Sequence, residues 1–219
     1  MTSPLRLAAA TAVGYLAGTL PSADVAARLA TGGATDLRAA GSGNPGAANA
    51  MALIGPAWGY GILVADVGKG VLAAQAGQRL AGGDGAHAAG AAAVIGHCFP
   101  VWNGFRGGKG VAASAGQCLA TFPAYTPIDL ALAAVTALSP WWKRRAFAAT
   151  TVASTAWVGT AVLWWWRNWP NAWGPVPSAA LPLAAAVSSS VILYRFATAS
   201  RPSVERPPEQ SAGPAGAAS

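Results

Sequence analysis

Apolar residues dominate the chain in long runs, and short segments rich in glycine, proline and basic residues separate these runs. A helix that crosses a bilayer needs about 20 mostly apolar residues, with a range of about 17 to 25. The pattern therefore predicts an all-α integral membrane protein with about seven transmembrane helices. Their predicted ranges are 4–29, 50–77, 86–102, 108–123, 125–140, 146–166 and 178–197.

Composition supports this interpretation. Of the 219 residues, 53% are hydrophobic and only 10% are charged, whereas soluble domains carry about 25% charged residues. The predicted membrane domain covers residues 1–198, and the Pro/Gly/Ser-rich segment 199–219 is predicted to be a disordered cytoplasmic tail. Cys98 and Cys118 lie in apolar segments, which favours buried free thiols over a disulfide or a metal site.

The basic residues predict the orientation. Ten of the 14 basic residues fall on the side of the odd-numbered loops and the C-terminus, and three fall on the other side. The remaining one, Lys69, lies inside the second predicted span. Because cytoplasmic loops carry the excess of Lys and Arg, the N-terminus is predicted outside and the C-terminus in the cytoplasm. Two glycine-rich basic loops then share the cytoplasmic face.

The first of these loops reads G-S-G-N-P-G over residues 41–46. Backbone N–H groups of successive glycines can converge on an anion. Ser42 and Asn44 add side-chain donors, and Arg38 offers a planar fork suited to phosphate oxygens. The helix expected near Pro45 would direct its N-terminus to the same place. The loop predicts a phosphate site, with a flexible linker as the alternative.

The second loop reads F-R-G-G-K-G over residues 105–110. It lacks the Walker pattern, but it offers glycine N–H donors and the mobile cation of Lys109. Phosphate binding is the physical interpretation. The alternative is a loop whose basic residues only set the topology.

Ionisable residues also lie within apolar runs. Asp66 and Lys69 are three residues apart and can pair on one helix face. The pair has either a functional role or a structural one, in which it holds two helices together. His97 at a helix end is a possible general base or a structural residue. Asp24 is expected to be structural, with Arg28 four residues on as its possible partner.

Four segments in order then resemble a known family. They are Y-L-A-G-T-L-P-S-A-D, D-L-R-A-A-G-S-G-N-P-G-A-A-N, A-D-V-G-K-G and G-H-C-F-P-V-W-N-G-F-R-G-G-K-G-V-A. The chain resembles the bacterial acyl-phosphate:glycerol-3-phosphate acyltransferases (PlsY) over residues 15 to about 115.

The resemblance implies an enzyme of phospholipid biosynthesis in the bacterial cell membrane, with its active site on the cytoplasmic face. Its substrates would be acyl phosphate and glycerol 3-phosphate, acylated at the 1-position to lysophosphatidic acid, with membrane lipids as further partners. No cofactor, metal or nucleic acid is implied. The implied catalytic residues are Arg38 and Ser42, and Asp66, Lys69 and His97 give possible support. The predicted substrate-binding residues are Gly41, Gly43, Asn44, Gly46, Asn49, Gly107, Gly108, Lys109 and Gly110.

The chain also departs from the family pattern. Ala48 stands where the family usually has threonine, and no serine-bearing segment follows the fifth predicted span. Phe196 and Ala199 stand where the family's third motif has histidine and asparagine. These departures leave two alternatives, a related acyltransferase with a different polar acceptor and a catalytically silent membrane protein that binds lipid.

Overall fold

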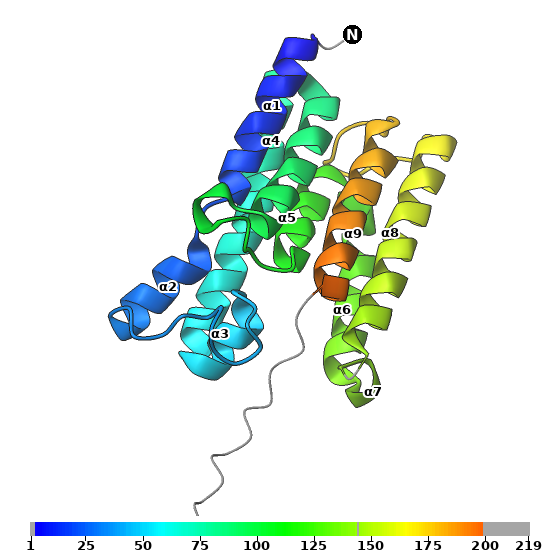
Figure 1. The fold of residues 1–219 in the computed structure, drawn as a ribbon. Helices are drawn as coiled ribbons and strands as arrows, with labels where there is room; N and C mark the ends of the chain where they lie inside the picture. Colours follow the sequence, from blue (N-terminus) through cyan, green and yellow to red (C-terminus); the bar gives the residue numbers. More distant parts are fainter. Residues whose placement is uncertain (1–2, 144, 199–219) are drawn as a thin grey trace, which may run out of the picture.

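The computed structural model describes residues 3–143 and 145–198, and within these ranges its regular elements are all helical (Figure 1). The predicted tail, including Ala199, lies outside the described residues. Two short 3₁₀ turns, η1 (Val101–Asn103) and η2 (Pro123–Tyr125), accompany the α-helices. The α-helices are α1 (Pro4–Gly18), α2 (Ser22–Thr31), α3 (Ala47–Leu53), α4 (Pro56–Cys98), α5 (Val111–Thr121), α6 (Thr126–Leu138), α7 (Pro140–Lys143), α8 (Ala146–Arg167) and α9 (Ala180–Thr198).

Two of the predicted helices are broken at prolines. The predicted helix 4–29 is divided into α1 and α2 at Pro21. The predicted helix 50–77 is divided into α3 and α4 between Gly55 and Pro56. A proline lacks an N–H and disfavours helical backbone in the residue before it, so each one begins a new helix. The short helix α2 is thereby directed away from the main bundle, whereas α3 packs against the start of α4, and the first glycine-rich loop lies between the two (Figure 1).

Helix α4 is long but bent. Ala81 and Gly82 have non-helical backbone angles, and Gly82 has a φ of 65°. The bend divides α4 into a first arm before Ala81 and a second arm after Gly82. Gly77 and Gly85 lie against each other across the bend, because a Cβ on either would strike the backbone of the other. The predicted spans 50–77 and 86–102 are therefore joined by a tight bend within α4. The segment of polar residues between the two predicted spans had suggested a longer connection.

Small residues bring α4 close to its neighbours. Gly14 and Gly18 of α1 lie against the backbone of the second arm at Ala89 and Ala93. Gly116 of α5 lies against the backbone of the first arm at Val67. Such contacts, which let helix backbones approach closely, are typical of helix packing in lipid. Because α1 packs against one arm of α4 and α5 packs against the other, the two arms lie at the centre of the fold.

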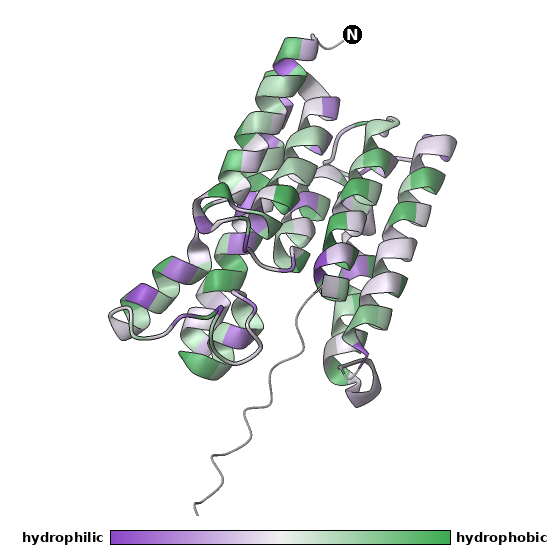
Figure 2. Cartoon of the chain, in the orientation of Figure 1, coloured by the Kyte–Doolittle hydropathy of each residue, from purple (hydrophilic) through white to green (hydrophobic). Residues whose placement is uncertain are grey.

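Two helices of the described residues, α8 and α9, are long and apolar enough to cross a membrane. A third crossing is possible if α5 and the following helix, which are bent by 114° to each other, count as one. Large apolar side chains are exposed over most of the helices, including Leu16, Leu72 and Leu183. Hydrophobic residues recur along the long helices in Figure 2. An apolar surface of this extent fits lipid rather than water.

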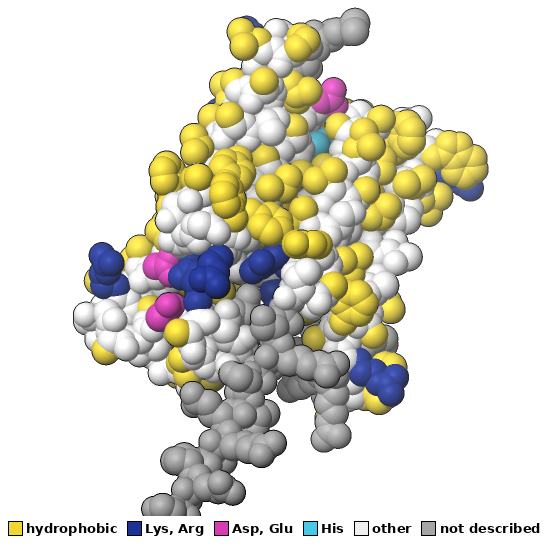
Figure 3. Space-filling model, in the orientation of Figure 1, with side chains coloured by type: hydrophobic (Ala, Val, Ile, Leu, Met, Phe, Trp, Pro, Cys, Tyr) yellow, Lys and Arg dark blue, Asp and Glu magenta, His cyan; other side chains and the backbone are white. Residues whose placement is uncertain are grey.

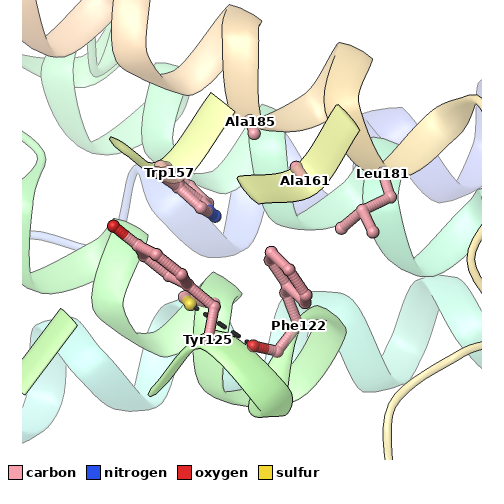
Figure 4. Close-up of a cluster of buried hydrophobic side chains, with 7 residues drawn as sticks. Phe122, Tyr125, Trp157, Ala161, Leu181 and Ala185 are labelled. Atoms are coloured by element: carbon pink, nitrogen blue, oxygen red, sulfur yellow. Dashed lines mark hydrogen bonds between the residues drawn. The ribbon is translucent and has the colours of Figure 1, made fainter. Parts of the chain in front are cut away.

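The largest buried cluster joins α5, η2, α8 and α9. Phe122 and Tyr125 stack with ring centroids 5.5 Å apart, and Trp157, Ala161 and Leu181 surround them (Figure 4). Cys118 belongs to this cluster, and both Cys98 and Cys118 are buried free thiols, as predicted. The cluster anchors α9, whose last turn reaches the functional site.

Candidate active site

The two glycine-rich loops face each other across one cavity of about 380 Å³. The first loop borders it between Asp36 and Pro45, the second between Arg106 and Lys109, and Thr198 of α9 also lines it. Basic side chains gather across the middle of the face in Figure 3. Among the described residues, four basic residues and one acidic residue line the cavity, and the basic ones are Arg38, Arg106, Lys109 and Arg195. This cationic cavity is suited to an anion.

Arg38 joins three parts of the site. Its guanidinium forms a two-pronged ion pair with the carboxylate of Asp24 in α2, and Nη2 lies 3.1 Å from Oδ2. Its Nε donates to the carbonyl oxygen of Arg106 in the second loop at 2.8 Å. Asn103 also donates to Asp24, at 2.7 Å. The expected partner of Asp24, Arg28, is therefore replaced by Arg38, because the chain turns back after α2 and brings a better-directed planar fork to the carboxylate.

The first loop is shaped by Asn49. This side chain is 5% exposed; its amide donates to the carbonyls of Leu37 and Ala40, and its oxygen accepts from the N–H of Ser42 at 2.9 Å. Asn49 does not line the cationic cavity. Asn49 holds the first loop in shape, because the loop backbone occupies both ends of its carboxamide, and its contact with substrate stays a prediction.

Several backbone N–H groups of the first loop bond within the loop itself and do not form the expected anion-binding nest. The N–H of Ser42 bonds to Asn49, that of Gly43 to the carbonyl of Ala40, and that of Gly46 to the carbonyl of Asn44. The left-handed backbone of Gly41 and Gly43, with φ of 61° and 68°, makes these tight turns possible. Within the described residues the Ser42 hydroxyl has no hydrogen-bond partner, and it lines the cavity.

The second loop is also held by its own backbone. The N–H groups of Gly107 and Gly108 donate to the carbonyls of Cys98 and His97 at 3.1 and 3.2 Å, so these two do not point at an anion as expected. The carbonyls of the same two glycines accept from the guanidinium of Arg195, at 2.6 Å from Nη2 and 3.1 Å from Nε. The α9 helix thereby fixes the second loop, a contact for which the local sequence gave no signal.

Lys109 lies between the second loop and α9. Its Nζ is 4.5 Å from the centroid of the Phe196 ring. Burial, and then the nearby charge of Arg195, lower the pKa of Lys109 from its ordinary value. Both effects disfavour an isolated ammonium at this position. A bound anion would offset both effects.

A buried polar network lies behind the second loop. Asp66 and Lys69 of α4 form an ion pair at 2.8 Å, and their side chains are 2% and 6% exposed. Ser22 of α2 donates to Asp66 at 2.6 Å and accepts from Lys69 at 3.0 Å. His97 Nδ1 lies 3.6 Å from the Asp66 carboxylate. The three predicted supporting residues are thus brought together, with Ser22 as a further member.

The network adjoins the cationic cavity through a narrow pocket of about 20 Å³, lined by Ser22, Arg38, Lys69, His97 and Gly107 among others. This volume is enough for a single water molecule. Gly108 lies against the His97 imidazole, which a Cβ at this position would strike. The glycine is therefore required for the close approach of loop and histidine.

An apolar groove of about 530 Å³ opens on the far side of this pocket. It runs between α2 and the first arm of α4, along Val25, Leu29, Trp58 and Leu72. Ser22 and Lys69 line both the groove and the narrow pocket. The cationic cavity and a lipid-like surface are thereby brought together at one end of the bundle.

The structure gathers about half of the predicted site residues in the cationic cavity. The remaining predicted substrate-binding residues do not line the cavity, and they contact other parts of the loops and their neighbouring helices. These residues are Gly41, Gly46, Asn49, Gly108 and Gly110. The lining residues absent from the prediction include Asp36, Arg106, Arg195 and Thr198. No cluster of three or more potential metal ligands was found among the described residues.

The chain is similar to a family of known proteins. A family model described as glycerol-3-phosphate acyltransferase matches residues 8–202. Proteins of that name from Maricaulis maris and Agrobacterium fabrum are 42% and 36% identical over 164 and 183 residues, which are 72% and 78% of this chain and 74% and 88% of theirs. One from Jannaschia sp. is 44% identical over 138 residues, 63% of this chain. That match spans 66% of the Jannaschia protein, slightly less than two thirds of its length.

A solved structure is similar across most of the chain. The crystal structure of PlsY (YgiH), an integral membrane glycerol 3-phosphate acyltransferase, in its glycerol 3-phosphate form has a TM-score of 0.66 and 26% identity. The similarity covers 86% of this chain and 88% of that one. Its lysophosphatidic acid form has a TM-score of 0.66 and 25% identity, and covers 87% of each chain.

Proposed function

Since the chain belongs to the glycerol-3-phosphate acyltransferase family, whose model spans residues 8–202, we propose that it moves a fatty acyl group from acyl phosphate to glycerol 3-phosphate. The product is 1-acyl-glycerol 3-phosphate, or lysophosphatidic acid. The related PlsY structures in glycerol 3-phosphate and lysophosphatidic acid forms support this acceptor and product.

The observation that carries the proposal is the cationic cavity. Both substrates bear a phosphate, and two anions repel each other unless cations surround them. Arg38, Arg106, Lys109 and Arg195 line one space of about 380 Å³, a size typical of small-molecule sites. The Ser42 hydroxyl adds a donor at the same wall.

The apolar groove suits the acyl chain of the donor. Its residues lie on α2 and the first arm of α4, and Ser22 and Lys69 connect it with the narrow pocket beside Arg38. An acyl chain in the groove would place its carbonyl carbon near this pocket and its phosphate in the cationic cavity. The charge and the apolar surface thus match the two ends of one donor.

The reaction needs orientation and charge stabilisation more than an activated side chain. The 1-hydroxyl oxygen of the acceptor bonds to the acyl carbon while the bond from that carbon to the phosphate oxygen breaks. Phosphate leaves with the electron pair, and the hydroxyl proton leaves with it as hydrogen phosphate. Arg38 and Ser42 would stabilise the charge on the reacting carbonyl and phosphate oxygens, and Lys109 would hold a phosphate.

We further propose seven passes through the bacterial cell membrane, formed by α1, the two arms of α4, α5, α6, α8 and α9. The chain begins at one end of the bundle, and α9 ends at the other, where both glycine-rich loops lie (Figure 1). The excess of basic residues in these loops favours the cytoplasm for that end. With 11 residues, α5 is only about 16 Å long, so α5 and α6 form a shortened pair of passes.

The test is phosphate release from palmitoyl phosphate by the purified full-length protein in lipid. We expect release that depends on glycerol 3-phosphate, with lysophosphatidic acid formed in equal amount. Release with another polar acceptor but not with glycerol 3-phosphate would replace the proposed acceptor. Absence of release with any acceptor would leave a lipid-binding protein without catalysis.

The ring of Phe196 is expected to assist Lys109. Phe196→Leu removes a cation–π contact worth about 0.5–1 kcal/mol at an exposed site. The KM for acyl phosphate should therefore rise about 2- to 5-fold, with little change in kcat. Initial rates at varied palmitoyl phosphate check this, with Phe196→Tyr as the matched control that keeps the ring. An unchanged KM in Phe196→Leu would exclude the role.

A further inference from the structure

A second groove lies apart from the residues of the proposed reaction. Its volume is about 560 Å³, and it runs between α1, the second arm of α4 and the N-terminal part of α9. Its floor consists of small residues of α4, Ala88, Ala91 and Ala92, and its sides include Leu7 of α1 and Leu183 of α9. In the part of the chain that the structure describes, no residue lines both this groove and the cationic cavity.

One end of this groove is polar. Asp84 of α4 is exposed, and its carboxylate accepts a hydrogen bond from the Ser178 hydroxyl at 2.8 Å. His87 lies one helical turn further along α4 and also lines the groove. Asp84 is the one charged side chain among the described residues that line the groove, so this end attracts a cation.

His87 is unusual in its surroundings. It is 1% exposed, and neither of its ring nitrogens has a hydrogen-bond partner among the described residues. An imidazole offers both a donor and an acceptor when neutral, and leaving such buried groups unpaired destabilises the folded protein. A groove-lining side chain in this state points to a ligand that supplies the missing partner.

The length of the groove fits one lipid chain. From Asp84 to Ile95, both of which line it, the helix rises through 11 residues, or about 16 Å. The hydrocarbon core of a bilayer is about 30 Å thick, so the groove is about as long as one leaflet. Its polar end lies near the bend of α4, where a lipid headgroup of that leaflet would be.

We propose that this groove binds one phospholipid with an ammonium headgroup, of the phosphatidylethanolamine type. One acyl chain lies over Ala88, Ala91 and Ala92, the ammonium pairs with Asp84, and the buried His87 ring turns into the groove to donate a hydrogen bond to an ester oxygen. A phospholipid with an anionic headgroup, such as phosphatidylglycerol, would bring negative charge to Asp84 without a basic residue in the lining to neutralise it.

The test uses the full-length protein in an uncharged detergent. Dioctanoyl phosphatidylethanolamine is titrated against it, the thermal midpoint is followed, and dioctanoyl phosphatidylglycerol serves as the comparison. We expect the ethanolamine lipid to raise the midpoint in a saturable way and the glycerol lipid to have a much smaller effect. Equal stabilisation by the two lipids would overturn the assignment of the headgroup.

Variants of the groove residues test where the ethanolamine lipid binds. Asp84→Asn is expected to weaken the apparent affinity for the ethanolamine lipid about 10-fold, since a charge-assisted contact is lost. His87→Phe, which keeps a ring of similar shape, should weaken it less. Gln75→Leu, on the first arm beside a different cavity, is the matched control and should bind as the parent protein does. Unchanged affinity in both Asp84→Asn and His87→Phe would refute the site.

Discussion

Replacement of Arg38 by alanine is expected to lower kcat for acyl transfer about 10²- to 10³-fold, the loss typical of removing one donor that stabilises the transition state. Arg38 contacts Asp24 in α2 and the Arg106 carbonyl in the second loop, so its loss also separates the two walls of the cavity. Arg38→Lys should recover little activity, because a single ammonium cannot make the same set of contacts.

The measurement is lysophosphatidic acid formation from palmitoyl phosphate and glycerol 3-phosphate by purified variants. Arg28→Ala is the matched control, since Arg28 is an exposed arginine of α2 only four residues from Asp24. Its activity should stay close to that of the parent protein. Full activity of Arg38→Ala with an intact thermal midpoint would refute the assigned role of Arg38.

The second large effect is expected at the buried ion pair. Lys69→Met leaves Asp66 charged and 2% exposed without its ammonium partner. Breaking a buried pair in this way costs about 3–5 kcal/mol. Lys69→Met and Asp66→Leu should each lower the thermal midpoint strongly and reduce the yield of folded protein in detergent.

The double variant Asp66→Leu/Lys69→Met separates packing from catalysis. Replacing both partners by apolar residues is often neutral for stability, so the midpoint should largely recover. Activity should stay low, because Ser22 and His97 lose the carboxylate that orients them beside the second loop. Recovery of both stability and activity would make the pair purely structural.

The local sequence was sufficient to find the two loops that line the cationic cavity. Arg38 and Lys109 beside glycine-rich segments predicted a phosphate site, and the charge distribution predicted that both loops share one face; the loops do line one cavity. Cys98 and Cys118 were also predicted as buried thiols from their apolar neighbours. Such features depend on composition and short spacing, which a sequence records directly.

The mechanism of the glycines was predicted incorrectly. Their N–H groups were expected to face the anion, whereas those of Gly43, Gly107 and Gly108 bond to nearby carbonyls. A glycine in a loop is equally compatible with a nest, a tight turn and a close approach. For Gly108 the tertiary structure selects the close approach, because its N–H bonds to the His97 carbonyl and its Cα lies against the His97 ring.

The sequence by itself determined the class of the protein and its helical character, and it predicted a phosphate ligand at the loops, because apolar run length and charge are local properties. The tertiary structure alone decided that Asp24 pairs with Arg38, that Arg195 fixes the second loop, and that His87 has no hydrogen-bond partner among the described residues. These contacts join residues that are 14 to 88 positions apart or depend on several packed helices. Their partners are selected by the folding of the chain, and no local pattern encodes that choice.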